Sequence, residues 1–231
     1  MAYIKKTISF FYRNIEIRAV VISLALALTA GLALLLSAAA YSDRVQGGIA
    51  DKVIRFHILA NSDSDKDQAL KLMVRDKVLS ELSGVMTGAE SAGEAREQLA
   101  VHIPAIEGWA SDVLTGQGSD YPVKAYLIQS YFPTRIYGDA AFPAGMYEAL
   151  RLEIGEGAGH NWWCMMFPPL CFVDAAIGYE EKEDKEEDQE ILKSHLTAEG
   201  YDLVTMSGGN EKVGIRFKIV EIWQGIKNLF R

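Results

Sequence analysis

Residues Val53 to Leu82 read VIRFHILANSDSDKDQALKLMVRDKVLSEL, and this stretch decides the fold because it passes from a strand pattern to a helix pattern. Its first part, Val53 to Ala60, is apolar and rich in β-prone residues, interrupted only by Arg55 and His57. Such a run predicts a buried strand. The rest is first polar and then periodic, so a loop and a helix are expected to follow the strand directly.

The residues after the strand contain a polar loop and a pattern that starts a helix. Asn61 to Asp67 is polar, and Ser64 followed by Asp67 three residues later is a pattern that caps a helix N-terminus. The helix has an apolar face, which consists of Leu70, Met73, Val74, Val78 and Leu82. A strand that leads through a loop into a packed helix indicates an α/β or α+β domain.

The residues that follow predict a small sheet with about two helices packed on it. A second helix is expected from about Ala92 to Leu114, with a break at Pro104. Val123 to Tyr131 and Tyr147 to Ile154 are rich in β-branched and aromatic residues and predict two more strands. Tyr137 to Gly145, between these strands, is expected to be a hairpin-like loop.

The first 40 residues have the layout of a signal peptide or signal anchor. Met1 to Arg18 contains four basic residues and one acidic residue, whereas Ala19 to Ala40 contains no charge. As a helix, the uncharged run would be roughly 30 Å long, which matches the hydrocarbon core of a bilayer. The small residues Ala38 to Ala40 also suit signal peptidase. We therefore expect export across a membrane, with cleavage and retention of the leader both open.

Charge and length limit the class of the exported part. The whole chain has a net charge of −8 and the leader contributes +3, which leaves about −11 for the remainder. An acidic protein is a poor partner for nucleic acid, which needs a basic surface. We assign one globular domain to residues 41–179, an acidic linker to 180–191 and a tail to 192–231.

The tail is expected to contain a basic amphipathic helix. Its apolar face consists of Ile215, Ile219, Ile222, Trp223, Ile226 and Phe230. Its basic residues are Lys212, Arg216, Lys218, Lys227 and Arg231. Such a helix either docks on its own domain or binds a membrane surface or a partner, because apolar and basic faces suit an anionic interface.

The segment from His160 to Cys171 contains the residue types that most often carry chemistry. Cys164 and Cys171 are the two cysteines of the chain, and outside the cytoplasm they can form a disulfide. If they are reduced, His160 could activate one of them as the nucleophile of a hydrolase. A zinc site would instead combine His57 and His160 with both cysteines. An aromatic loop that simply packs on the sheet is equally compatible with the sequence, which defines no firm metal or cofactor site.

Two long strings resemble the stage II sporulation protein R family. They are FHILANSDSDKDQALKLMVRDKVL, from Phe56 to Leu79, and GEGAGHNWWCMMFPPLCFVD, from Gly155 to Asp174. The strings YPVKAYL and FPAGMYEALRLEIG lie between them in the same order. The resemblance spans about Val53 to Asp174, which is most of the expected folded part.

The resemblance implies a secreted signal of endospore-forming bacteria that acts between the forespore and mother-cell membranes. It implies a membrane-embedded aspartic protease as the partner, which removes the pro-sequence of sigma-E when it is activated. The chain would then be an activator, and the alternative is an exported cysteine-dependent hydrolase that acts on cell-wall or peptide substrates. Exposed groups of the second string are candidate partner contacts, because aromatic residues often dominate interfaces. They are His160, Asn161, Trp162, Trp163 and Phe167.

Overall fold

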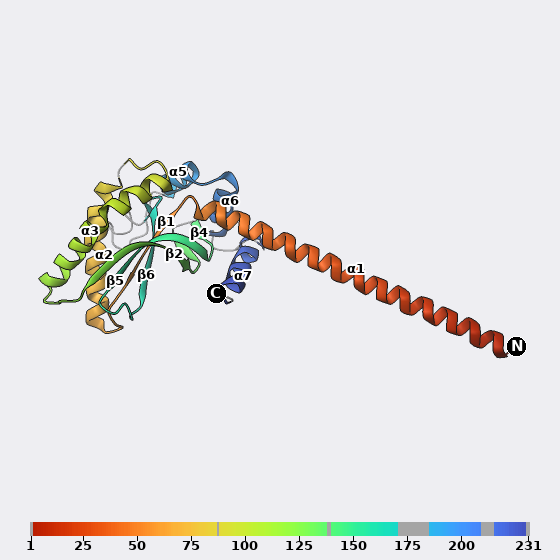
Figure 1. Ribbon diagram of the computed structural model, residues 1–231. Coiled ribbons are helices and arrows are strands. Elements are labelled where there is room, and N and C mark those ends of the chain that lie inside the picture. Colours follow the sequence, from red (N-terminus) through yellow and green to blue (C-terminus); the bar gives the residue numbers. More distant parts are fainter. Residues whose placement is uncertain (1, 87, 138–139, 171–184, 209–214, 230–231) are drawn as a thin grey trace.

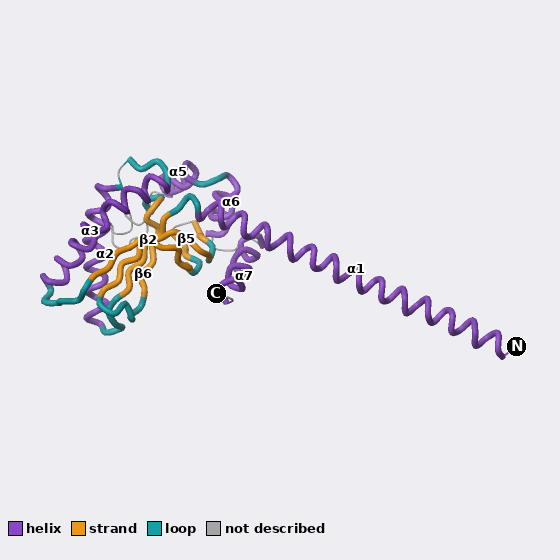
Figure 2. Tube along the Cα trace, in the orientation of Figure 1, coloured by secondary structure: helices purple, strands orange, loops and turns teal. Residues whose placement is uncertain are grey.

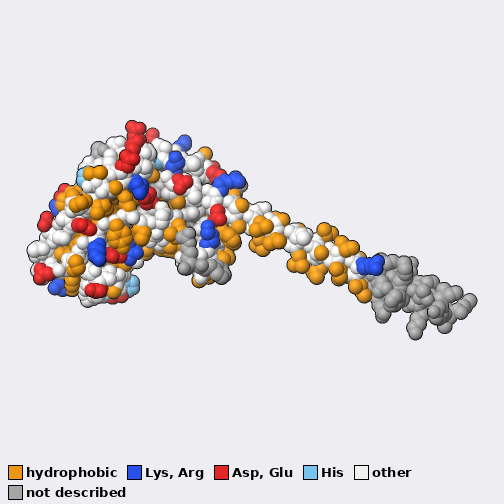
Figure 3. Space-filling model, viewed as in Figure 1, with side chains coloured by type: hydrophobic (Ala, Val, Ile, Leu, Met, Phe, Trp, Pro, Cys, Tyr) orange, Lys and Arg blue, Asp and Glu red, His pale blue; other side chains and the backbone are white. Residues whose placement is uncertain are grey.

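A long helix projects from a compact body. The computed structural model describes residues 2–86, 88–137, 140–170, 185–208 and 215–229. Helix α1 (Ala2–Ala50) leads away from a sheet and the remaining helices (Figure 1). From Ile17 onward α1 is long and apolar enough to cross a membrane, and its leucines are exposed, Leu34 at 72%. Figure 3 shows these apolar side chains along the helix, whereas charged and apolar side chains are mixed on the body.

The body is built on a four-stranded sheet with the strand order β2-β5-β1-β6. Its strands are β1 (Ile54–Leu59), β2 (Val123–Phe132), β5 (Gly145–Ile154) and β6 (Asn161–Phe167). β1 runs parallel to β5, while β2 pairs antiparallel with β5 and β6 pairs antiparallel with β1. β1 is therefore central and buried along its whole length, as its apolar sequence predicts, and β6 lies at an edge.

Helices α2 (Asp65–Val85) and α3 (Ala92–Gly116) lie together against one side of the sheet (Figure 2). The Ser64 side chain accepts the Asp67 N–H and caps α2, which confirms the predicted start of this helix. The core between the helices and the sheet includes Phe56, Ile58, Leu70, Val74, Leu99, Ile106, Leu150 and Leu152, each at most 4% exposed. Burial of such side chains is the main source of stability for a body of this size.

Shorter elements complete the body. They are the hairpin strands β3 (Arg135–Tyr137) and β4 (Ala140–Phe142) and the helices α5 (Lys185–His195), α6 (Ala198–Gly208) and α7 (Ile215–Leu229). α6 packs beside β4, and α7 packs against α1. The last turns of α1 take part in this packing, since Val45 and Ile49 are buried and Gln46 Nε2 donates to Met146 O at 2.7 Å.

The mixed α/β class is confirmed, but several details differ from the prediction. The described part of the chain has six helices where about two were expected. α3 passes through Pro104 without a break, because Leu99 and Ile106 are buried on either side of it. α1 continues ten residues beyond the expected boundary at residue 40.

Loops were also expected where the structure has regular elements. The hairpin-like loop contains β4, and the segment that was considered as a packed aromatic loop contains the edge strand β6. The predicted acidic linker becomes helical from Lys185, where α5 begins, and residues 180–184 lie outside the described part. These elements are short or covered on both sides, so hydrophobic periodicity does not reveal them.

Candidate functional site

Two loops meet at the end of the sheet where β1 finishes and β6 begins. The glycines before β6 allow this approach: a Cβ on Gly155, where φ is +60°, would lie 2.2 Å from Asn61 Oδ1. A Cβ on Gly159 would lie 2.3 Å from Ser62 O. Two backbone bonds join the loops, from Gly159 N–H to Ala60 O at 2.9 Å and from Ala158 N–H to Asn61 O. The glycines therefore admit a neighbouring segment of this chain, which places His160 beside the loop that begins α2.

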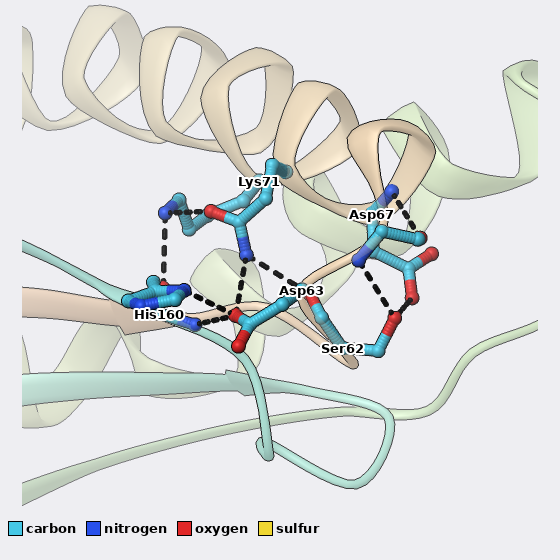
Figure 4. A network of polar contacts seen from close by, with 7 residues as sticks. Ser62, Asp63, Asp67, Lys71 and His160 are labelled. Atoms are coloured by element: carbon cyan, nitrogen blue, oxygen red, sulfur yellow. Dashed lines mark hydrogen bonds and ion pairs between the residues drawn. The ribbon is translucent and has the colours of Figure 1, made fainter.

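His160 and Asp63 form an exposed pair at this junction (Figure 4). The Asp63 carboxylate accepts the His160 backbone N–H at 2.6 Å and also contacts ring Nδ1. Lys71 Nζ, from the second turn of α2, donates to His160 O at 2.9 Å. The His160 and Asp63 side chains remain 79% and 55% exposed, so the backbone is held while both side chains face solvent.

A second group of hydrogen bonds holds the loop itself. The Asp67 carboxylate accepts from Ser62 Oγ at 2.6 Å and from Asn61 Nδ2 at 2.9 Å. These bonds favour the charged form and hold the pKa of the Asp67 carboxyl below its usual range. Asp67 is buried, so its role is to fix the loop, and the exposed acid beside it is Asp63.

Two basic side chains of α2, the buried Lys71 and the largely buried Arg75, lie beside β6. Burial lowers the pKa of Lys71, and the nearby Asp63 carboxylate opposes that effect. One turn further along α2, the Arg75 guanidinium lies 5.2 Å from the ring centre of Trp162, a cation–π arrangement. Trp162 also packs edge-on against Phe56 at 5.8 Å. We call His160, Asp63, Lys71, Arg75 and Trp162 the β6 edge site.

Neighbouring residues of β6 face the other side of the sheet, because side chains alternate along a strand. Trp163 stacks on His57 with a centroid distance of 4.9 Å and an interplanar angle of 11°. Burial lowers the pKa of His57 to about 4, and the positive charge of Arg151 adds to this effect. Among the described residues, neither ring nitrogen of His57 has a partner at good hydrogen-bond geometry, although the Asn161 side chain lies close enough to oppose the lowering of its pKa. His57 is thus a neutral, buried ring within an aromatic cluster.

The candidates for cysteine chemistry are not assembled into a reactive group. Cys164 is disulfide-bonded and 3% exposed, and Cys171 lies outside the described residues. Because β6 is extended, the four-residue step from His160 to Cys164 covers about 13 Å. Among the residues that the structure describes, no three His, Cys, Asp or Glu side chains are grouped to hold a metal ion. His160 therefore has an acid beside it but no neighbouring thiolate.

The candidate partner contacts do not all lie on the same side of β6. His160 and Trp162 lie on the α2 side of β6, and Asn161 and Trp163 lie on the His57 side. Phe167 is 3% exposed and packs edge-on against His195 at 5.0 Å, so a partner would not reach its ring. Of the predicted contacts, the β6 edge site thus contains the exposed His160 and the half-buried Trp162.

Sequence reasoning missed the environment of Arg55. This side chain is fully buried, and its guanidinium lies 4.6 Å from the Phe132 ring centre and 5.1 Å from that of Tyr147. Nη2 donates to Tyr137 Oη at 3.3 Å, while Nε and Nη1 have no hydrogen-bond partner among the described residues. Burial lowers the pKa of Arg55. The signal in the sequence is an arginine within an apolar strand, although its aromatic neighbours come from distant segments.

Together, the apolar helix and the body define a mixed α/β protein whose N-terminal helix is compatible with export or membrane anchoring. Residues 50–177 match the family described as stage II sporulation protein R, and the chain belongs to this family. It is 42% identical over 140 residues to the stage II sporulation protein R of Bacillus subtilis (strain 168). That alignment covers 60% of this chain and 62% of the relative, so the chain spans under two thirds of that protein. No solved structure matches the chain.

Proposed function

We propose that the chain is a sporulation signal that activates, by direct contact, the membrane-embedded aspartic protease that processes pro-sigma-E. The observation that carries this proposal is the family match over residues 50–177, which includes all of β1, α2 and β6. The β6 edge site is built from these elements. The family membership supports a sporulation role, and the geometry of the site supports action through contact.

The β6 edge site has the properties of a protein-binding surface. It combines a half-buried tryptophan, a guanidinium held over that ring, and an exposed His–Asp pair on a fixed backbone. Tryptophan and arginine are enriched among the residues that dominate interface energies, and a preorganised backbone lowers the cost of binding. An activator must bind the active arrangement of its partner more tightly than the resting one, and only this difference shifts the equilibrium.

The cysteine hydrolase alternative has less support. Its nucleophile would be a thiolate, whereas Cys164 is bonded as a disulfide and points into the core. A disulfide sulfur does not supply the thiolate that attacks an acyl carbon.

The test is a processing assay in which the full chain is co-produced with the protease and pro-sigma-E. We expect His160→Ala and Trp162→Leu each to reduce processing roughly ten-fold, the effect of losing a central interface contact. His160 is exposed, so its truncation spares the core, and Leu at position 162 keeps an apolar side chain against Phe56.

His102→Ala on α3 is the matched control, because it removes a half-exposed histidine outside the β6 edge site. Full processing by both β6 variants at equal protein levels would remove this site from the mechanism. Cleavage of pro-sigma-E by the chain without the protease would contradict the activator role itself.

A further inference from the structure

Helix α7 lies across the base of α1, immediately after the apolar run. Trp223 Nε1, Gln224 Nε2 and Lys227 Nζ all donate to Asp43 Oδ1, at 3.1, 3.1 and 3.0 Å. Val220 and Gln224 are buried, at 0% and 4% exposure. In the common view of Figures 1 and 2, α7 runs across the direction of α1 rather than along it. The C-terminal helix thus docks on its own chain through one side.

The opposite side of α7 is apolar and open to solvent. Ile222, Ile226 and Leu229 are 61%, 41% and 83% exposed. Their spacing of four and three residues places them along one side of the helix. Exposed apolar side chains grouped in this way are typical of a surface that binds something.

The depth of α7 relative to α1 indicates what this side meets. Asp43 lies three residues beyond Ala40, where the uncharged run ends. Three residues of helix span about 4.5 Å. When the uncharged run fills the hydrocarbon core, Asp43 therefore lies in the headgroup layer. α7 is therefore held at the level of the lipid headgroups by its contacts with Asp43.

The remaining contacts of α7 leave its apolar side uncovered by the body. Glu221 accepts from Thr134 Oγ1 at 2.9 Å, which ties a second side of α7 to the body. With α1 on one side and the body on another, Ile222 and Ile226 project from the side that is left, away from the body. Lys218 borders the apolar side and its side chain is 55% exposed, whereas Lys227 lies on the docked side and pairs with Asp43.

We propose that α7 lies in the headgroup layer of an anionic membrane, with Ile222, Ile226 and Leu229 inserted toward the acyl chains and Lys218 near lipid phosphates. An interfacial helix binds through this combination of apolar area and basic charge. The inference concerns how the body is held at a bilayer. It does not depend on which protease the chain activates, so the two proposals fail separately.

The test places a polarity-sensitive fluorophore on Leu229→Cys in the full chain, reconstituted in vesicles with about 30% phosphatidylglycerol in phosphatidylcholine. The matched control is the same label on Val101→Cys, an exposed apolar position on α3 at 77% exposure. The unsubstituted chain must take up no label. We expect quenching by aqueous iodide to be roughly five-fold weaker at position 229 than at position 101.

Ile222→Asn combined with Ile226→Asn should abolish this protection, since both side chains are exposed and the docked side of α7 is unchanged. Protection should also weaken in pure phosphatidylcholine. Equal quenching at positions 229 and 101 overturns the proposal. Protection that disappears when the protein is diluted in excess lipid overturns it too, because the apolar side would then be covered by a second copy of the chain.

Discussion

Protonation of His57 should destabilise the body at mildly acidic pH. His57 is 2% exposed, stacks on Trp163 and, among the described residues, has no partner at good hydrogen-bond geometry at either nitrogen. Burial and the charge of Arg151 lower its pKa from 6.5 to about 4. Between these values the unfolded chain binds a proton at this residue and the folded chain does not. Stability is therefore fully present above about pH 6.5 and is lost as the pH falls toward 4.

The size of this loss follows from the shift. One pKa unit corresponds to about 1.4 kcal/mol, so the shift of His57 corresponds to about 3 kcal/mol between pH 6.5 and pH 4. That is a large fraction of the 5–15 kcal/mol by which a typical domain is stable. Asp67 also loses stabilising contacts in acid, but its lowered pKa places that loss below the usual carboxyl range and outside this window.

The assay is thermal unfolding of the full chain in detergent, followed by near-ultraviolet circular dichroism at several pH values between 7.5 and 4. His57→Phe keeps an aromatic ring against Trp163 and removes the titrating group, so its stability should depend less on pH than that of the parent. His102→Phe is the matched control because it retains His57. An equal loss of stability in His57→Phe and the parent across this window would refute the reasoning.

Two further predictions concern the backbone of the site and the buried cation. Gly155→Ala should lower the free energy of unfolding by about 1–3 kcal/mol, because the residue has a positive φ and its Cβ would collide with Asn61. Gly108→Ala, within α3 and with open space around it, should raise it by up to about 1 kcal/mol, and urea titration compares the two. Arg55→Met should leave the melting temperature unchanged or higher, because a buried cation with no acidic partner among the described residues is replaced by an apolar side chain of similar length. A marked fall would show that its aromatic contacts outweigh the cost of burial.

The sequence predicts those parts of the fold that are encoded locally. β1 and α2 follow from an apolar run, a capping serine and a 3.6-residue period, all within one stretch of chain. β6 does not follow in this way, because Trp162 packs toward α2 and Trp163 packs on His57. Because both sides of β6 are covered, its sequence does not alternate between polar and apolar residues, which is the pattern that predicts a strand.

The site was harder to predict because it depends on distant segments. Asp63 and His160 are 97 positions apart, and only the pairing of β1 with β6 brings them together. In the sequence, Asp63 belongs to a polar run that is fully accounted for as the start of a helix, so nothing in it indicates a site. The glycines before β6 allow this approach, and the segment that comes close to their backbone is the Asn61 loop.

The position of the β6 edge site relative to α1 bears on where a partner would be. β1 starts four residues after α1 ends, and its six residues run away from that helix over about 20 Å. The loops that carry Asp63 and His160 lie beyond the far end of β1, away from the base of α1 and to one side of its direction (Figure 1). If α1 or α7 holds the chain at a bilayer, the site lies about one strand length from that anchor. A partner would therefore have to reach it with a part that extends outside the membrane.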